Sequence, residues 1–373
     1  MPRVHIRSWR SRLRARRLAP RLAPRLAPLL LAVLSSCRWL TAGDPAPLAP
    51  AAAGAQRVVS LCATTCRDSV DIVALGVDGY LVVPWRDTTR LALTPPSYSN
   101  PSLWHLALRD WWWGTRPNAS RIARGLRAAP GLEARLTQVR AVLVGHGHYD
   151  HALDLPPLLP RMPAATVYGS ATVAHLLRPA VGPAPERSMA VMPGQDIVIG
   201  PQLRARALAW GHAPNLGRWT LAAGRYTRDR ESLPRTVHGW RMGEPLAWAI
   251  DVRAADGSVA LRLFHHDAAA SLEVVRAAVA ALRTMPRAAH TVVILTAANW
   301  DQASGYPGAL LASLEPDHVL FGHWEDFFRS PAKAPKVVRG ISARELVREV
   351  ERFVGPRWSV LAPGATLRLR LGT

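Results

Sequence analysis

The sequence has few cysteines, few lysines and no long apolar run. Three cysteines in 373 residues are too few for a disulfide-based scaffold. No stretch reaches the roughly 18 consecutive apolar residues of a spanning helix, which excludes a protein that crosses a membrane several times. Only 2 of the 47 basic residues are lysine, a skew typical of a GC-rich coding sequence. With 49% hydrophobic and 20% charged residues, the chain is nevertheless composed like a globular protein.

Acidic residues are also scarce, and the resulting positive charge is unevenly distributed. The formal net charge is +21, and ten of these charges are arginines within residues 1–38, where no acid occurs. The remaining +11 is spread over the rest of the chain and favours anionic partners through the overall field. No basic run with interleaved aromatic residues occurs, so no nucleic-acid partner is expected.

Residues 1–38 are predicted to be an export signal. A basic segment precedes the short apolar stretch at residues 29–34, and Ser35-Ser36-Cys37 follows it, an order typical of secretory signals. Residues 34–37 also resemble the bacterial lipobox, in which the cysteine is acylated. The protein is therefore expected to be exported and either membrane-anchored through Cys37 or periplasmic. The alternative is that the start codon is misassigned, in which case the protein would be cytoplasmic.

Residues 39–56 are rich in alanine and proline, which predicts a linker that buries no core. Residues 57–373 alternate β-rich runs with amphipathic helical patterns, without an intervening linker, so they are expected to form one α/β domain. Cys62 and Cys66 would pair in an oxidising compartment and stay reduced in the cytosol. A structural role is expected for them, because no second pair completes a zinc site.

The patterns within this domain predict specific elements. A hairpin is expected at residues 70–84 with its turn at Asp78-Gly79, and a helical segment at 118–139 interrupted at Pro130-Gly131. Further strands are expected at 90–94, 141–145, 203–210, 246–252, 259–264, 291–297 and 367–371. Further helices are expected at 157–162, 170–178, 271–283 and 342–353.

Four metal-binding side chains follow the apolar strand predicted at residues 141–145. They are His146, His148, Asp150 and His151. In an extended chain His146 and His148 face the same side, and a turn after them can bring the other two to a neighbouring position. Neutral imidazole and carboxylate groups suit zinc, and also iron or manganese. A polar loop without metal would leave several of these imidazoles without partners.

The His-x-His-x-Asp-His pattern after a short apolar strand resembles the signature of the metallo-β-lactamase fold hydrolases. With Leu153-Asp154 after it, the motif is most similar to the branch that contains N-acylphosphatidylethanolamine-hydrolysing phospholipase D and the ascorbate-phosphate lactonases. The resemblance extends over most of residues 57–373. It implies an αββα four-layer sandwich with a binuclear metal site at one edge of its two sheets.

The resemblance implies three further ligands, each after a predicted strand: His212, Asp267 and His323. They follow at even intervals of 61, 55 and 56 residues after His151. The implied ligands are divided between two divalent ions, most simply zinc, with manganese or iron as alternatives. One ion is held by His146, His148 and His212, the other by Asp150, His151 and His323, and Asp267 bridges them.

Two such ions, about 3.5–4 Å apart, can share a hydroxide that acts as the nucleophile at neutral pH. Asp150 is expected to orient it. His266, where relatives carry glycine, is a candidate catalytic residue, and packing is the alternative for it and for His265. Candidate pocket residues are His238, Asn299, Asp301 and Tyr306, and candidate partners of the His323 ring are Glu325 and Asp326.

These observations predict a binuclear metal-dependent hydrolase of a phosphodiester such as a phospholipid. The alternative substrate is a lactone or an amide, β-lactams included, and an apolar groove leading to the metals would favour the lipid. A nuclease with an inserted domain is disfavoured, because the 56 residues between Asp267 and His323 leave no room for one. A non-catalytic metal-binding protein is disfavoured by the complete ligand set.

A run of three tryptophans, Trp111-Trp112-Trp113, follows Trp104, Leu106 and Leu108. Tryptophan favours the boundary between an apolar and a wet environment. In a lipid-anchored protein these residues would form an interfacial lip. The alternative is a packed loop that covers the sandwich.

Overall fold

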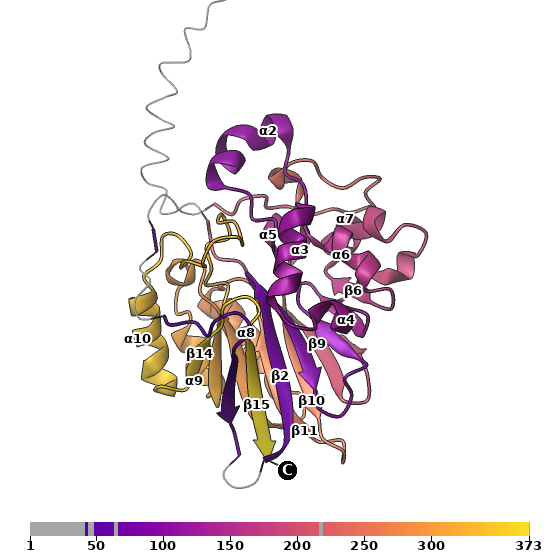
Figure 1. Ribbon diagram of the computed structural model, residues 1–373. Coiled ribbons are helices and arrows are strands. Elements are labelled where there is room, and N and C mark those ends of the chain that lie inside the picture. Colours follow the sequence, from indigo (N-terminus) through magenta and orange to yellow (C-terminus); the bar gives the residue numbers. More distant parts are fainter. Residues whose placement is uncertain (1–41, 44–47, 63–65, 216–218, 373) are drawn as a thin grey trace, which may run out of the picture.

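The computed structural model describes residues 42–43, 48–62, 66–215 and 219–372. The predicted signal and Cys37 lie outside the described residues. Two β-sheets lie against each other, and helices cover their outer faces (Figure 1). Nowhere in the described ranges is a helix both long and apolar enough to cross a bilayer. A disulfide joins Cys62 and Cys66 near the start of the first sheet.

The first sheet has eight strands, and its order places the last strand of the chain between the first two. The strands from β15 to β4 pair antiparallel, whereas β4 to β7 pair parallel, and β1 is parallel to β15. In spatial order they are β1 (Gln56–Ser60), β15 (Thr366–Gly372), β2 (Cys66–Gly76), β3 (Gly79–Pro84), β4 (Leu91–Leu93), β5 (Val139–Leu143), β6 (Thr166–Gly169) and β7 (Ser188–Ala190).

The second sheet has seven strands. Its strands from β11 to β14 pair parallel, and those from β8 to β11 pair antiparallel. In spatial order they are β14 (Trp358–Val360), β13 (His318–Gly322), β12 (Ala288–Thr296), β11 (Val259–His265), β10 (Leu246–Arg253), β9 (Leu203–Ala209) and β8 (Asp196–Val198).

Helices lie on both outer faces of this pair of sheets, and Figure 1 shows α9 and α10 on one side and α4, α6 and α7 on the other. The helices are α2 (Asp110–Trp113), α3 (Ala119–Ala128), α4 (Leu132–Leu136), α5 (Tyr149–Ala152), α6 (Leu155–Leu158), α7 (Ala171–Val181), α8 (Leu272–Arg283), α9 (Gly308–Leu314) and α10 (Ala343–Val354).

Three apolar cores follow from the two-residue period of the strands. In β2, Ile72 contributes to the core between the sheets, and its neighbour Val73 contributes to the core under α3 and α7. In β11, Leu263 faces the other sheet, and Phe264 packs in the third core under α8, α9 and α10. The order of layers is therefore helix, sheet, sheet, helix, which confirms the predicted four-layer α/β sandwich.

The locally encoded elements are confirmed. The predicted hairpin is β2 and β3, and the predicted helical segment at 118–139 divides into α3 and α4. The division falls at Gly131, whose φ of 71° suits glycine and interrupts the helix. Among the elements missing from the predictions are the short strands β1, β6, β7, β8 and β14, the helix α9 and the helical turns within residues 102–113, whose patterns are too short to identify.

His318, buried at the start of β13, makes the stability of this fold depend on pH. Its Nε2 lies 2.8 Å from Ser359 Oγ. Burial, with Arg57 and Arg357 nearby, lowers the pKa of His318 to about 4. The unfolded chain therefore binds a proton at higher pH than the folded protein. The stability that the neutral ring contributes is fully present above about pH 6.5 and is lost as the pH falls toward 4.

We expect His318→Gln to remove this dependence. Between about pH 7.5 and 4.5, the unmodified protein should lose about 2–3 kcal/mol more free energy of unfolding than the variant. Urea unfolding of both proteins at the two pH values measures the difference. Protonation of the other histidines affects both proteins equally and cancels. Equal losses would show that His318 does not titrate in this way.

Candidate metal centre

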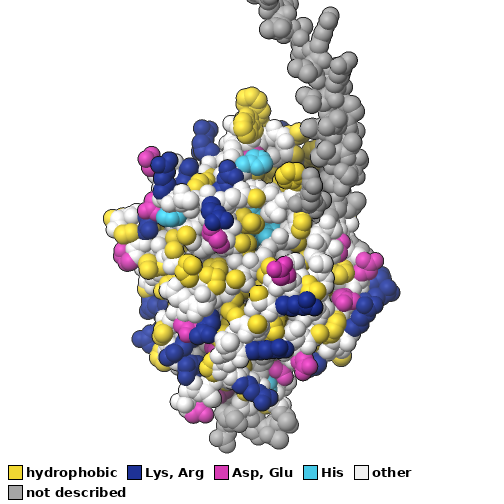
Figure 2. Space-filling view, turned by 180° about the vertical axis from the view of Figure 1, so that it is seen from behind, with side chains coloured by type: hydrophobic (Ala, Val, Ile, Leu, Met, Phe, Trp, Pro, Cys, Tyr) yellow, Lys and Arg dark blue, Asp and Glu magenta, His cyan; other side chains and the backbone are white. Residues whose placement is uncertain are grey.

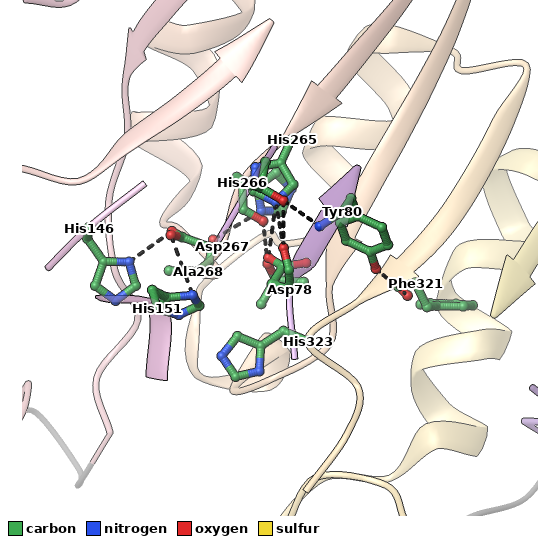
Figure 3. A network of polar contacts seen from close by, with 12 residues as sticks. Asp78, Tyr80, His146, His151, His265, His266, Asp267, Ala268, Phe321 and His323 are labelled. Carbon is green, nitrogen blue, oxygen red and sulfur yellow. Dashed lines mark hydrogen bonds and ion pairs between the residues drawn. The ribbon is translucent and has the colours of Figure 1, made fainter. Parts of the chain in front are cut away.

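The seven predicted metal ligands come together where four strands end. His146 and His148 follow β5 of the first sheet, and Asp150 and His151 lie in α5 directly after them. The other three, His212, Asp267 and His323, follow β9, β11 and β13 of the second sheet. Because both sheets contribute, the ligands meet at an edge that the sheets share. Figure 3 shows four of them, His146, His151, Asp267 and His323, pointing toward one another. We refer to all seven as the ligand cluster.

The first group of the cluster contains three imidazoles. A ligand atom from each of His146, His148 and His212 lies within 4.8 Å of the others. His146 Nε2 is 2.9 Å from His148 Nδ1. His212 donates a hydrogen bond from Nδ1 to the carbonyl of Ala213 at 2.6 Å. That bond fixes the ring so that Nε2 stays available as a ligand.

The second group contains Asp150, His151 and His323, again with ligand atoms within 4.8 Å of one another. Asp150 Oδ2 lies 3.4 Å from His323 Nε2 and 3.8 Å from His151 Nε2. The carboxylate of Asp267 lies between the groups. Its Oδ1 is 2.8 Å from His146 Nδ1, and its Oδ2 is 3.8 Å from His151 Nδ1.

Burial sets the protonation of the cluster. It holds the pKa of His146 and of His148 well below the usual value and lowers that of His151 to about 3. Burial alone would raise the pKa of Asp150, but His151 and His323 beside it hold that pKa well below its usual range. These three rings are therefore neutral and Asp150 is ionised, which are the forms that bind metal.

The residues present fit divalent metal ions. The buried atoms His148 Nε2 and His323 Nδ1 have no hydrogen-bond partner, which is costly unless another group binds there. Five imidazoles and two carboxylates in two adjoining groups are a donor set suited to zinc, manganese or iron. The structure thus brings together all seven residues that the sequence analysis named as ligands.

A second set of titratable residues lies beside the cluster, and its member Asp78 was not predicted from the sequence to be buried. Asp78, in the turn between β2 and β3, is buried, with Oδ2 3.5 Å from His265 Nε2 (Figure 3). Glu325 accepts a hydrogen bond from the Val77 backbone at 2.7 Å, and burial raises its pKa to about 8. The only local signal is the Asp-Gly pair, which indicates a turn and not a buried carboxylate.

His266 does not reach the space above the cluster. Its ring is fully buried and stacks on Trp210 at 4.7 Å, with Tyr306 edge-on at 5.6 Å. Burial lowers its pKa to about 3. A catalytic residue must contact the reacting atoms, and the position of His266 corresponds instead to the packing alternative. Tyr306 likewise donates to the Thr296 carbonyl rather than lining the site.

A cavity of about 310 Å³ lies directly over the ligand cluster. Its floor is formed by His148, Asp150, His212, Asp267 and His323. Its walls are mainly apolar and include Leu103, Leu106, Leu221, Val237 and Phe327. Of the predicted pocket residues, His238 and Asn299 line it, and Asp301 does not.

Glu325 and Asp326 were candidate partners of the His323 ring, but their hydrogen bonds go elsewhere. Asp326 pairs with Arg339 at 3.1 Å, and Glu325 binds the Val77 backbone. His323 itself has a φ of 46°, in the left-handed region, and its backbone N–H donates to the Val77 carbonyl at 3.1 Å. Such a strained ligand residue depends on the surrounding structure to hold it.

Comparisons with known proteins identify the family of this chain. The family model described as beta-lactamase superfamily domain matches residues 108–324. No curated protein matched the sequence. Similar solved structures include the metallo-beta-lactamase fold protein YhfI from Bacillus subtilis (11% identity, TM-score 0.45, covering 81% of this chain and 100% of that one). A second is yeast PDE1 (11% identity, TM-score 0.44, covering 82% of this chain and 100% of that one). A third is Zn²⁺-bound PqqB from Methylobacterium extorquens (12% identity, TM-score 0.40, covering 80% of this chain and 99% of that one). Since the family model covers more than half of the chain, the protein belongs to the beta-lactamase superfamily, with the metallo-β-lactamase fold.

Proposed function

We propose that the protein is a metal-dependent hydrolase of phosphodiesters that carry apolar chains, such as phospholipids. Members of this superfamily are mostly metal-dependent hydrolases. The observation that carries the proposal is the cavity, whose mainly apolar walls rise directly from the ligand cluster. Such walls suit an acyl chain better than a sugar or a nucleotide. The resemblance of the motif to the phospholipase D branch supports the same substrate class.

The ligand cluster would hold two divalent ions in the grouping described, with Asp267 between them. When bound, such ions lower the pKa of a water toward neutrality and neutralise the charge that develops on a phosphoryl oxygen. Asp150, an ionised member of the cluster, orients the attacking water. The hydrogen bond from His212 to Ala213 keeps that ring in its binding tautomer.

The remaining residues of the cavity bind and position the substrate. Leu103, Leu106 and Leu221 contact the apolar chain and exclude bulk water, which strengthens the electrostatic interactions inside. His238 and Asn299 are polar groups at this cavity that can hydrogen-bond to the phosphate or to the group that leaves. With Asn215 and Thr296, which also line the cavity, these two side chains can set the headgroup preference.

We further propose that the protein acts outside the cytoplasm, anchored or close to a membrane. The order of basic, apolar and small residues in residues 1–38 supports export, and Cys37 is the residue that would carry a lipid. The disulfide between Cys62 and Cys66 supports an oxidising compartment.

The test is the product formed from a phospholipid mixture. The full chain is loaded with zinc or manganese and incubated with the mixture, and the products are identified by mass spectrometry. We expect phosphatidic acid from the unmodified protein and none above background from Asp150→Asn, which has the same shape without the charge. Asp196→Asn, which removes an exposed carboxylate, is the matched control and should keep full activity.

Other products identify other chemistry. Free fatty acid would show that an acyl ester or amide is cleaved and would support the lactone or amide alternative. No product from any lipid, with metal content verified, would exclude the phospholipid substrate.

A further inference from the structure

We infer that residues 102–113, here called the knob, dock the protein on an anionic phospholipid bilayer and place the cavity against it. The knob consists of the π-helical turn η2 (His105–Arg109) and α2, with the residues just before them, and it stands at the tip of the molecule (Figure 1). This inference deepens the proposed function, because it assumes that the cavity takes its substrate from a lipid surface.

The knob has two apolar faces with different roles. Leu103, Leu106 and Ala107 point inward and line the cavity. Five large side chains on the outer face are between 57% and 76% exposed: Trp104, Leu108, Trp111, Trp112 and Trp113. Figure 2 shows hydrophobic side chains gathered at this tip. An exposed apolar patch rich in tryptophan is typical of a surface that enters the membrane interface.

Hydrogen bonds at its base hold the knob in this position. The buried carboxylate of Asp110 accepts from Thr115 Oγ1 at 2.6 Å and from the Val237 backbone at 3.0 Å. The Thr115 backbone donates to the Arg235 carbonyl at 2.7 Å. His105 Nε2 lies 2.9 Å from the Gly114 carbonyl. The tryptophans therefore face outward because the backbone is fixed against the segment at 235–237.

The charges around the knob suit lipid phosphates. Asp110 is the only acidic residue in residues 101–118, and it is buried, whereas Arg109 and Arg116 are exposed. A second cavity, of about 290 Å³, adjoins the start of the knob at Ser102 and is lined by Arg121, Arg329, Lys333 and Arg339. Its one carboxylate, Asp326, is paired with Arg339. Apolar side chains at the tip and cations near its base match the order of acyl chains and phosphates across a leaflet.

This arrangement favours a bilayer over a partner protein. A stable protein interface usually buries about 800 Å² on each partner and has a polar rim. The knob is a narrow projection of twelve residues that carries tryptophans on its outer face and no exposed acid. A bilayer accepts such a projection by insertion. Insertion here would bring the cavity mouth to the level of the lipid headgroups.

The experiment is hydrogen exchange of the full chain with and without vesicles of phosphatidylcholine and phosphatidylglycerol in equal amounts. Mass spectrometry of peptides separates the knob from residues 1–38, whose arginines bind anionic vesicles by themselves. We expect amides of residues 102–113 to exchange at least about tenfold more slowly with vesicles. Trp111→Ser/Trp112→Ser/Trp113→Ser should abolish this protection. Met192→Ser/Val198→Ser, which removes exposed apolar side chains outside the knob, should retain it.

Two results would overturn the inference. One is a vesicle-bound protein in which the knob exchanges as fast as in solution. The other is protection of the knob that appears without vesicles as the protein concentration rises, which would identify a second copy of the chain as the occupant. Should the triple variant fail to fold, the single Trp112→Ser variant and the unmodified protein still give the comparison. No turnover is measured, so this result is independent of whether phospholipid is hydrolysed.

Discussion

Asp267→Asn should prevent the ligand cluster from holding two metal ions side by side. We expect the rate of hydrolysis to fall by about 1,000-fold or more. The carboxylate of Asp267 reaches both groups, at 2.8 Å from His146 and 3.8 Å from His151. The amide has the same shape but carries no charge. Two cations held close together repel each other strongly unless an anion lies between them. Removing the charge of Asp267 should therefore cost more binding free energy than losing an ordinary hydrogen bond would.

The two readouts are metal content per chain, measured by elemental analysis after gel filtration, and turnover of the proposed lipid substrate. Asp196→Asn serves as the control, because it replaces an exposed carboxylate that pairs only with Arg206 at the surface. A variant that retains all of its metal and most of its activity would show that Asp267 does not bridge the groups.

Gly145→Ala should also lower turnover strongly, although glycine carries no functional group. A Cβ at position 145 would lie 2.2 Å from Asp267 Oδ2, far inside van der Waals contact. Gly145 follows β5 of the first sheet and Asp267 follows β11 of the second, so this glycine permits the close approach of the sheets at the site. Displacing a catalytic group by about 1 Å can cost about 100-fold in rate. We therefore expect a fall of that size in turnover, together with weaker metal binding.

The matched control for this substitution is Gly211→Ala, which also precedes a predicted ligand. There the nearest heavy atom to the new Cβ would be Val274 Cγ2, at 3.3 Å, a side chain that can shift slightly. Metal titration and turnover of both variants test the idea, with thermal unfolding to confirm that each is folded. Equal behaviour of the two would contradict a specific role for the space at Gly145.

The parts of the fold encoded by local patterns could be predicted from the sequence. The break between α3 and α4 follows from Pro130 and Gly131, and the hairpin of β2 and β3 follows from alternating apolar residues around Asp78-Gly79. The position of β15 between β1 and β2 could not be predicted, because residues 56–60 and 366–370 pair across three hundred positions. A two-residue period shows that a strand has a buried face but not which strand lies beside it.

The site was predictable to the extent that its ligands follow strands. His146 to His151 form a dense motif, and His212, Asp267 and His323 each follow an apolar run. Burial was not predictable. The sequence does not show that Asp78 is buried beside His265, or that His266 stacks on Trp210 away from the cavity. Both depend on how the two sheets pack against each other.

The place of β15 has a consequence for the way the protein is made. Without β15, β1 has no partner and β2 exposes an edge, so the first sheet is incomplete during most of translation. The sheet that carries His146 and His148 can be completed only after β15 has been synthesised. Assembly of the centre, which needs both sheets, becomes an event that follows synthesis.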